Sequence, residues 1–141
     1  MLLCPWADLA NIRDQTHGEP QPVATPEQQR RWMNSYLAGH PNDDAVVSPL
    51  TADLTGFPPM LIQAGTGDPL VEDAHLLADH ARGHDVDVRL QLYPVPTHDF
   101  HIFWSFLPEA ADALHQAGRF IRDTTPRKTP MPQAPGSGTS G

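Results

Sequence analysis

The sequence predicts an α/β protein with about three parallel strands, flanking helices and a small helical insertion. Two observations indicate this fold class. Strand-like and helix-like segments alternate along residues 1–123, which is typical of parallel sheets with helical crossovers. Short apolar runs also end at glycine or proline just before a helix can begin. Because crossovers of this kind are right-handed, consecutive strands are expected to lie side by side with their ends at one edge.

The first part of the chain is expected to form a short strand and then a helix. Residues 1–8 are a continuous apolar run interrupted by proline, as in a strand that is covered on both faces. A helix is predicted over 26–38, with Thr25 as its N-cap. Gln28 would complete a capping box, and Gly39 stands where the chain must leave the helix.

The second part repeats strand and helix twice. Residues 58–65 form a short apolar strand ended by glycine, and a helix is expected from Pro69, with Gly83 as its left-handed C-terminal cap. Residues 86–92 alternate apolar and polar, which indicates a strand with one wetter face at an edge of the sheet. The last helix is expected over 108–123, with its apolar residues on one side.

Composition limits the domain count and the partners. Residues 1–123 are expected to form one domain, and the Pro/Gly/Ser-rich residues 124–141 a disordered tail. The 9 basic and 17 acidic residues give a net charge of −8, which argues against binding to nucleic acid or anionic membranes. The single cysteine, Cys4, allows no intrachain disulfide, and the opening apolar run is too short to span a bilayer. A reducing, cytoplasmic location is therefore expected.

Two residues, Asp68 and His98, are candidates for catalysis because each follows the end of its own strand. Neighbouring parallel strands would bring them together, so that the carboxylate orients the imidazole and the imidazole acts as a general base. Asp68 also has the position of an ordinary helix N-cap, and His98 that of a loop histidine bonded to backbone. Asp73, one turn further into the same helix, is the alternative acid.

Other histidines are weaker candidates. His75, His80 and His84 could together present a metal-binding face. A solvated helix face is the favoured interpretation, because no cysteine or closely spaced carboxylate completes a site. His101 is expected to be a loop or helix-start residue whose substitution would change turnover little. No metal or organic cofactor is predicted.

Four segments together resemble a known family. They are the opening CPWADL, the stretch SPLTADLTGFPPMLIQAG, DPL at 68–70 and THDF around His98. In order and spacing, residues 2–121 resemble the C-terminal half of the hormone-sensitive-lipase-like α/β-hydrolases, which are carboxylesterases, lipases and acetyl-hydrolases. The resemblance implies a partial α/β-hydrolase fold with the last three strands of the family. It implies Asp68 as triad acid, His98 as triad base, a small acyl-ester substrate and no cofactor.

The chain departs from the family pattern at the nucleophile. None of its five serines lies in a G-x-S-x-G elbow, and no H-G-G-G oxyanion loop is present. The expectation is a C-terminal fragment of a serine carboxylic-ester hydrolase that is inactive alone. The alternatives are a half-enzyme that needs a separate N-terminal chain, and a non-catalytic binding module. The unpaired edge of the first strand would then favour self-association.

Overall fold

The computed structural model describes residues 1–9 and 25–125. Three parallel strands form one sheet in the order β1 (Leu2–Leu3), β2 (Met60–Gly65) and β3 (Val88–Tyr93). In this register Ile62 of β2 lies between Leu2 and Leu90. The predicted α/β fold with three parallel strands is confirmed, and the strand expected at an edge does lie there.

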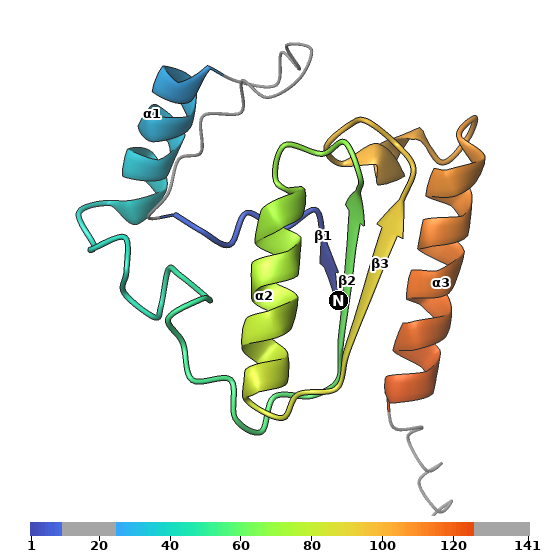
Figure 1. Cartoon of the computed structure of the whole chain (residues 1–141). Helices are drawn as coiled ribbons and strands as arrows, with labels where there is room; N and C mark the ends of the chain where they lie inside the picture. The colour runs from blue at the N-terminus through green and yellow to red at the C-terminus, as the bar shows by residue number, and fades with distance from the viewer. Residues whose placement is uncertain (10–24, 126–141) are drawn as a thin grey trace, which may run out of the picture.

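Two helices cover the sheet on opposite faces (Figure 1). Leu61 packs against Ala117 and Phe120 of α3 (Pro108–Thr124). Its neighbour Ile62 belongs to a second core cluster with the inner face of α2 (Val71–Gly83). Successive residues of a strand point to opposite faces, so β2 is buried from both sides. That burial explains why its sequence is almost continuously apolar.

The helical insertion is α1 (Pro26–Leu37), which stands away from the sheet in Figure 1. Its predicted capping box is present. The Gln28 amide donates to Thr25 Oγ1 at 3.2 Å, and the Thr25 amide donates to Gln28 Oε1 at 2.8 Å. The helix ends one residue earlier than expected, because Ala38 already takes the left-handed conformation with a φ of 48°.

The end of α2 corrects one prediction. Gly83 is the last helical residue and not the left-handed cap; that conformation is taken by Asp85, with a φ of 59°. The amides of Asp85 and Val86 donate to the carbonyls of Arg82 and Ala81, which is the hydrogen-bond pattern of a Schellman motif. A short polar side chain tolerates this conformation nearly as well as glycine does.

Several other boundaries differ from the prediction by a few residues. β1 has only two residues, α2 begins two residues later than Pro69, and β3 begins at Val88. α3 reaches Thr124, so nearly all of the tail expected over 124–141 lies outside the described residues. Within the described ranges, no helix is both long and apolar enough to cross a membrane.

Candidate active site

The structure brings Asp68 and His98 together. His98 Nδ1 lies 3.0 Å from Asp68 Oδ2 and 3.2 Å from Oδ1. The Asp68 side chain is fully buried, and the His98 side chain is 24% exposed. Because the carboxylate can only accept, Nδ1 is the donor in this contact. The other ring nitrogen, Nε2, lies 3.5 Å from Oδ2 of the exposed Asp99.

Asp68 also organises the start of α2. Its Oδ1 accepts a hydrogen bond from the Leu70 amide at 2.8 Å, and its carbonyl accepts one from the Val71 amide at 3.0 Å. The N-cap of α2 is Leu70, which makes no side-chain cap bond. Asp68 is therefore not the N-cap, although its carboxylate contacts both the start of the helix and the imidazole.

Two glycines allow the loops that carry Asp68 and His98 to approach each other. A Cβ on Gly65 would lie 2.7 Å from the Val95 carbonyl oxygen, and one on Gly67 would lie 2.7 Å from Pro96 Cα. Neither distance is sterically possible without movement. The Gly67 amide also donates to the Val95 carbonyl at 3.0 Å. The backbone contact between the two loops thus requires glycine on the Asp68 side.

Cys4 completes the group, and the sequence analysis missed it. It follows β1 directly, has a φ of 44° and is buried. Its sulfur, a carboxylate oxygen of Asp68 and a ring nitrogen of His98 all lie within 4.8 Å of one another. The rule that predicted the other two residues applied here as well, because Cys4 also stands at the carboxyl end of a parallel strand.

The pKa shifts reflect this arrangement. Burial raises the pKa of the Asp68 carboxyl, but hydrogen bonds from His98, the Leu70 amide and Cys4 lower it further than burial raises it. The hydrogen bond to Asp68 raises the pKa of His98 against the opposing effect of burial. Burial, and then the neighbouring carboxylate, raise the pKa of Cys4 to about 12. The thiol is therefore protonated at neutral pH and is not a nucleophile by itself.

The alternative acid has a different position. Oδ2 of Asp73 accepts hydrogen bonds from the backbone amides of Ala7 and Asp8, both at 2.9 Å. Asp73 thus fixes the segment after β1 to the first turn of α2, while the carboxylate bonded to His98 is that of Asp68. Because Cys4 precedes Ala7 in that segment, the hydrogen bonds to Asp73 also help to hold Cys4 in place.

His101 is more buried than expected. It lies in the 3₁₀ helix η1 (Phe100–Phe103), is only 5% exposed, and its Nε2 lies 3.2 Å from Gln63 Oε1. Burial lowers its pKa, so the neutral ring is favoured. Gln63 in turn donates to Gln91 Oε1 at 2.8 Å and to the Ala113 carbonyl at 3.0 Å. The ring belongs to a polar network inside the core, so its substitution would disturb packing.

His80 of α2 and His84, which follows the helix, each have one ring nitrogen beside a backbone carbonyl. His80 Nε2 lies 2.8 Å from the Ala52 carbonyl, and His84 Nδ1 lies 2.9 Å from the His80 carbonyl. Each of these two nitrogens donates its proton to the carbonyl, so only the other nitrogen of each ring could bind a metal. In the described part of the chain, the group of metal-binding side chains that does converge is Cys4, Asp68 and His98.

Comparison with known proteins places this geometry in a family. A family model described as alpha/beta hydrolase fold matches residues 1–102.

The chain belongs to the α/β-hydrolase family.

Curated relatives of this chain include an acetyl-hydrolase from Streptomyces hygroscopicus, which is 34% identical over 125 residues. The match covers 87% of this chain and 42% of that relative. The putative acetyl-hydrolase LipR of Mycobacterium tuberculosis is 30% identical over 122 residues, covering 86% and 40%. The chain therefore spans about two fifths of the length of these relatives.

Solved structures agree with the sequence relatives. The crystal structure of EstE5 soaked with ethyl alcohol has a TM-score of 0.79 and 30% identity, covering 87% of this chain and 43% of that one. An esterase from the bacterial hormone-sensitive lipase family has a TM-score of 0.78 and 31% identity, covering 87% and 42%. The predicted resemblance to hormone-sensitive-lipase-like hydrolases is thus confirmed.

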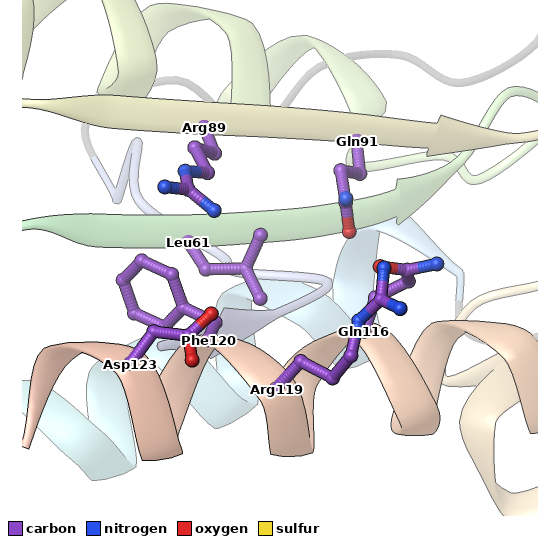
Figure 2. Close-up of a pocket in the computed structure, with 7 residues that line it drawn as sticks. All are labelled: Leu61, Arg89, Gln91, Gln116, Arg119, Phe120 and Asp123. Atoms are coloured by element: carbon purple, nitrogen blue, oxygen red, sulfur yellow. The ribbon is translucent and has the colours of Figure 1, made fainter.

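A hollow of about 350 Å³ lies elsewhere on the chain, between the sheet and α3 (Figure 2). Leu61 and Phe120 form its apolar part, and the Arg89 guanidinium lies 5.7 Å from the centre of the Phe120 ring. Neither Asp68 nor His98 lines it. The hollow is therefore separate from the candidate active site.

Proposed function

We propose that this chain supplies the acid and the base of a serine carboxylic-ester hydrolase, with Asp68 as the acid and His98 as the base. The observation that supports this proposal is the 3.0 Å contact between His98 Nδ1 and Asp68 Oδ2, in a member of the α/β-hydrolase family. The nucleophilic serine and the oxyanion donors come from polypeptide outside these 141 residues, either a longer chain or a separate N-terminal half.

The geometry fits the division of labour in a catalytic triad. Asp68 accepts from Nδ1–H, so Nε2 is the nitrogen that would take a proton from a serine hydroxyl, on the side of the ring where Asp99 Oδ2 lies 3.5 Å away. The imidazolium formed in this step is stabilised by the buried carboxylate, in keeping with the raised pKa of His98. His98 then returns the proton to the departing alcohol. Asp68 remains ionised throughout, since its own pKa is lowered.

The proposed substrate is a small acyl ester. The names of the relatives, acetyl-hydrolase and esterase, support this class. Alone, the 141-residue chain is proposed to be inactive, because its sequence has no serine elbow to give His98 a proton. We further propose that it works in the cytoplasm, where its thiol stays reduced, and that the edge of β1 pairs with the missing part of the sheet or with a second copy.

Co-expression tests the proposal. The chain is produced together with the N-terminal part of the Streptomyces acetyl-hydrolase that it does not match, and hydrolysis of a short-chain nitrophenyl ester is measured. Turnover is expected only when both chains are present. His98→Ala should reduce it by roughly 10⁴-fold or more. His115→Ala is the matched control, because His115 is exposed on α3, and it should leave turnover unchanged.

Three outcomes would contradict the proposal. Ester hydrolysis by the chain alone would refute the claim that the nucleophile comes from outside it. Full activity of the two chains together when this one carries His98→Ala would refute the assignment of His98 as the base. If the two chains together hydrolyse no ester, while the complete Streptomyces enzyme is active in the same assay, the chain is not half of an enzyme. Thermal stabilisation of the chain by acyl ligands, without turnover, would then support a binding module.

A further inference from the structure

A thiol, a carboxylate and an imidazole converge where the three strands end. One ligand atom of each residue, Cys4, Asp68 and His98, lies within 4.8 Å of the other two. The three side chains come from the loops that follow β1, β2 and β3, so the sheet itself fixes their spacing. Cys4 and Asp68 are buried, and His98 is partly exposed. Thiolate sulfur, imidazole nitrogen and carboxylate oxygen are the three kinds of ligand atom that zinc takes in proteins.

We propose that Cys4, Asp68 and His98 form a binding site for a soft divalent cation of the Zn²⁺ or Cd²⁺ type. Zinc binds sulfur at about 2.3 Å and nitrogen or oxygen at about 2.0–2.2 Å. Ligand atoms around one tetrahedral ion are therefore about 3.3–3.8 Å apart. The Asp68–His98 contact of 3.0–3.2 Å would open slightly to admit the ion, and Cys4 Sγ already lies within 4.8 Å of both. Three protein ligands and one water would complete the coordination.

The charge balance favours binding. The cation replaces the thiol proton of Cys4, and at His98 the remaining ring proton moves from Nδ1 to Nε2. With a neutral imidazole, one proton is released to solvent, and a second is released if His98 was protonated. The thiolate and the Asp68 carboxylate then neutralise the two positive charges of the ion. A neutral complex suits a buried site, where an uncompensated charge would be costly.

The sulfur sets the selectivity. Thiolate ligands favour Zn²⁺ and similar soft ions, whereas Mg²⁺ and Ca²⁺ require several oxygen ligands, of which this group has only the Asp68 carboxylate. The partly exposed ring of His98 provides the side from which an ion can enter.

Occupation of the site would block the proposed chemistry. The ion takes the carboxylate and Nδ1, so Asp68 no longer orients the imidazole, and Nε2 carries the proton instead of accepting one. Soft cations would therefore inhibit any assembly that uses this pair. This consequence rests on the proposed function, whereas binding of the ion does not.

Cadmium titration of the 141-residue chain tests the site directly. A Cd–thiolate bond gives an ultraviolet charge-transfer absorption, and Cys4 is the only cysteine in the sequence. We expect this absorption to grow and to saturate at one equivalent of Cd²⁺, with Zn²⁺ displacing the Cd²⁺ and Mg²⁺ having no effect. No thiolate absorption at one equivalent would overturn the proposal without recourse to any variant.

Variants separate a three-ligand site from a lone thiolate. His98→Gln and Asp68→Asn keep Cys4 but should weaken Cd²⁺ binding by at least roughly 10- to 100-fold, the loss caused by changing even the outer partners of a metal ligand. His115→Gln, on the exposed face of α3, should bind as the unchanged chain does. If both His98→Gln and Asp68→Asn fold, as circular dichroism reports, and bind Cd²⁺ undiminished, the three residues do not form a site. None of these outcomes depends on esterase activity, so failure here is distinct from failure of the proposed function.

Discussion

Substitution of Gly65 by alanine should separate the loops that hold Asp68 and His98. The added Cβ would lie 2.7 Å from the Val95 carbonyl oxygen and 2.9 Å from Val95 Cγ2. Ordinary contacts begin at 3.4 Å, so the loop that leads to His98 must move by about 0.7 Å at its nearest atom. Gly65 belongs to β2, which is buried on both faces, so it is the loop that moves.

The magnitude follows from this overlap. Overpacking of a tight core contact costs about 1–3 kcal/mol of unfolding free energy, and we expect Gly65→Ala to fall in that range. The hydrogen bond from the Gly67 amide to the Val95 carbonyl, now 3.0 Å, should lengthen as well. In an assembled enzyme, a misplacement approaching 1 Å at the acid–base pair should reduce turnover by about 10²-fold.

Urea unfolding and amide hydrogen exchange measure these effects. The Gly67 amide should exchange faster in Gly65→Ala than in the unchanged chain. Gly118→Ala is the matched control, because Gly118 lies within α3 and its added Cβ would meet only an arginine side-chain nitrogen at 3.6 Å. That control should raise the unfolding free energy by about 0.5–1 kcal/mol. Unchanged stability and exchange in Gly65→Ala would refute the close approach of the loops.

Asp68→Asn should lower the pKa of His98 in an NMR titration, because the carboxylate whose hydrogen bond and charge raise it is lost. The loss of unfolding free energy in Asp68→Asn should be largest between pH 3.8 and 6.5. In the unchanged chain, the stabilisation from Asp68 is lost as pH falls through the lowered pKa of Asp68. The stabilisation from His98 is lost as pH rises through the raised pKa of His98. If the difference in unfolding free energy between Asp68→Asn and the unchanged chain, measured with urea, does not vary with pH, this prediction is wrong. Phe100→Ala should cost about 3–5 kcal/mol in the same assay, since Phe100 is fully buried beside Cys4; a loss below about 1 kcal/mol would show that the site is loosely packed. Asp73→Ala should cost about 1–3 kcal/mol by leaving two buried amides unbonded, and the Cys4 amide should exchange faster; unaltered exchange would show that this anchor does not hold β1.

The contact between Asp68 and His98 could be predicted from the sequence, because the positions of the two residues depend on simple rules. Apolar runs and alternation located β2 and β3, and the handedness of the crossover placed their ends at one edge. Asp68 and His98 follow those ends, and they do lie in contact. The N-cap interpretation of Asp68 is wrong, because the N-cap of α2 is Leu70, but the carboxylate does accept a hydrogen bond from the Leu70 amide.

Other features depend on tertiary contacts that leave little trace in a single sequence. Gln63 is one polar residue in an apolar strand, and only the fold shows that His101, Gln91 and the end of α3 share its hydrogen bonds. A single cysteine, Cys4, indicates only that no intrachain disulfide can form, whereas its position after a strand is the more informative property. At the end of α2, glycine is the usual left-handed residue, yet Asp85 takes that role because the helix continues through Gly83.

The tautomer of His98 tests the central claim most directly. A long-range proton–nitrogen NMR spectrum of the 141-residue chain, recorded above the pKa of His98 and assigned with His98→Gln, shows which ring nitrogen carries the proton. The contact with Asp68 predicts a protonated Nδ1 and a bare Nε2, and Asp68→Asn should remove this preference. A proton on Nε2 in the unchanged chain, or the same spectrum in Asp68→Asn, would contradict an imidazole oriented by Asp68 to receive a proton.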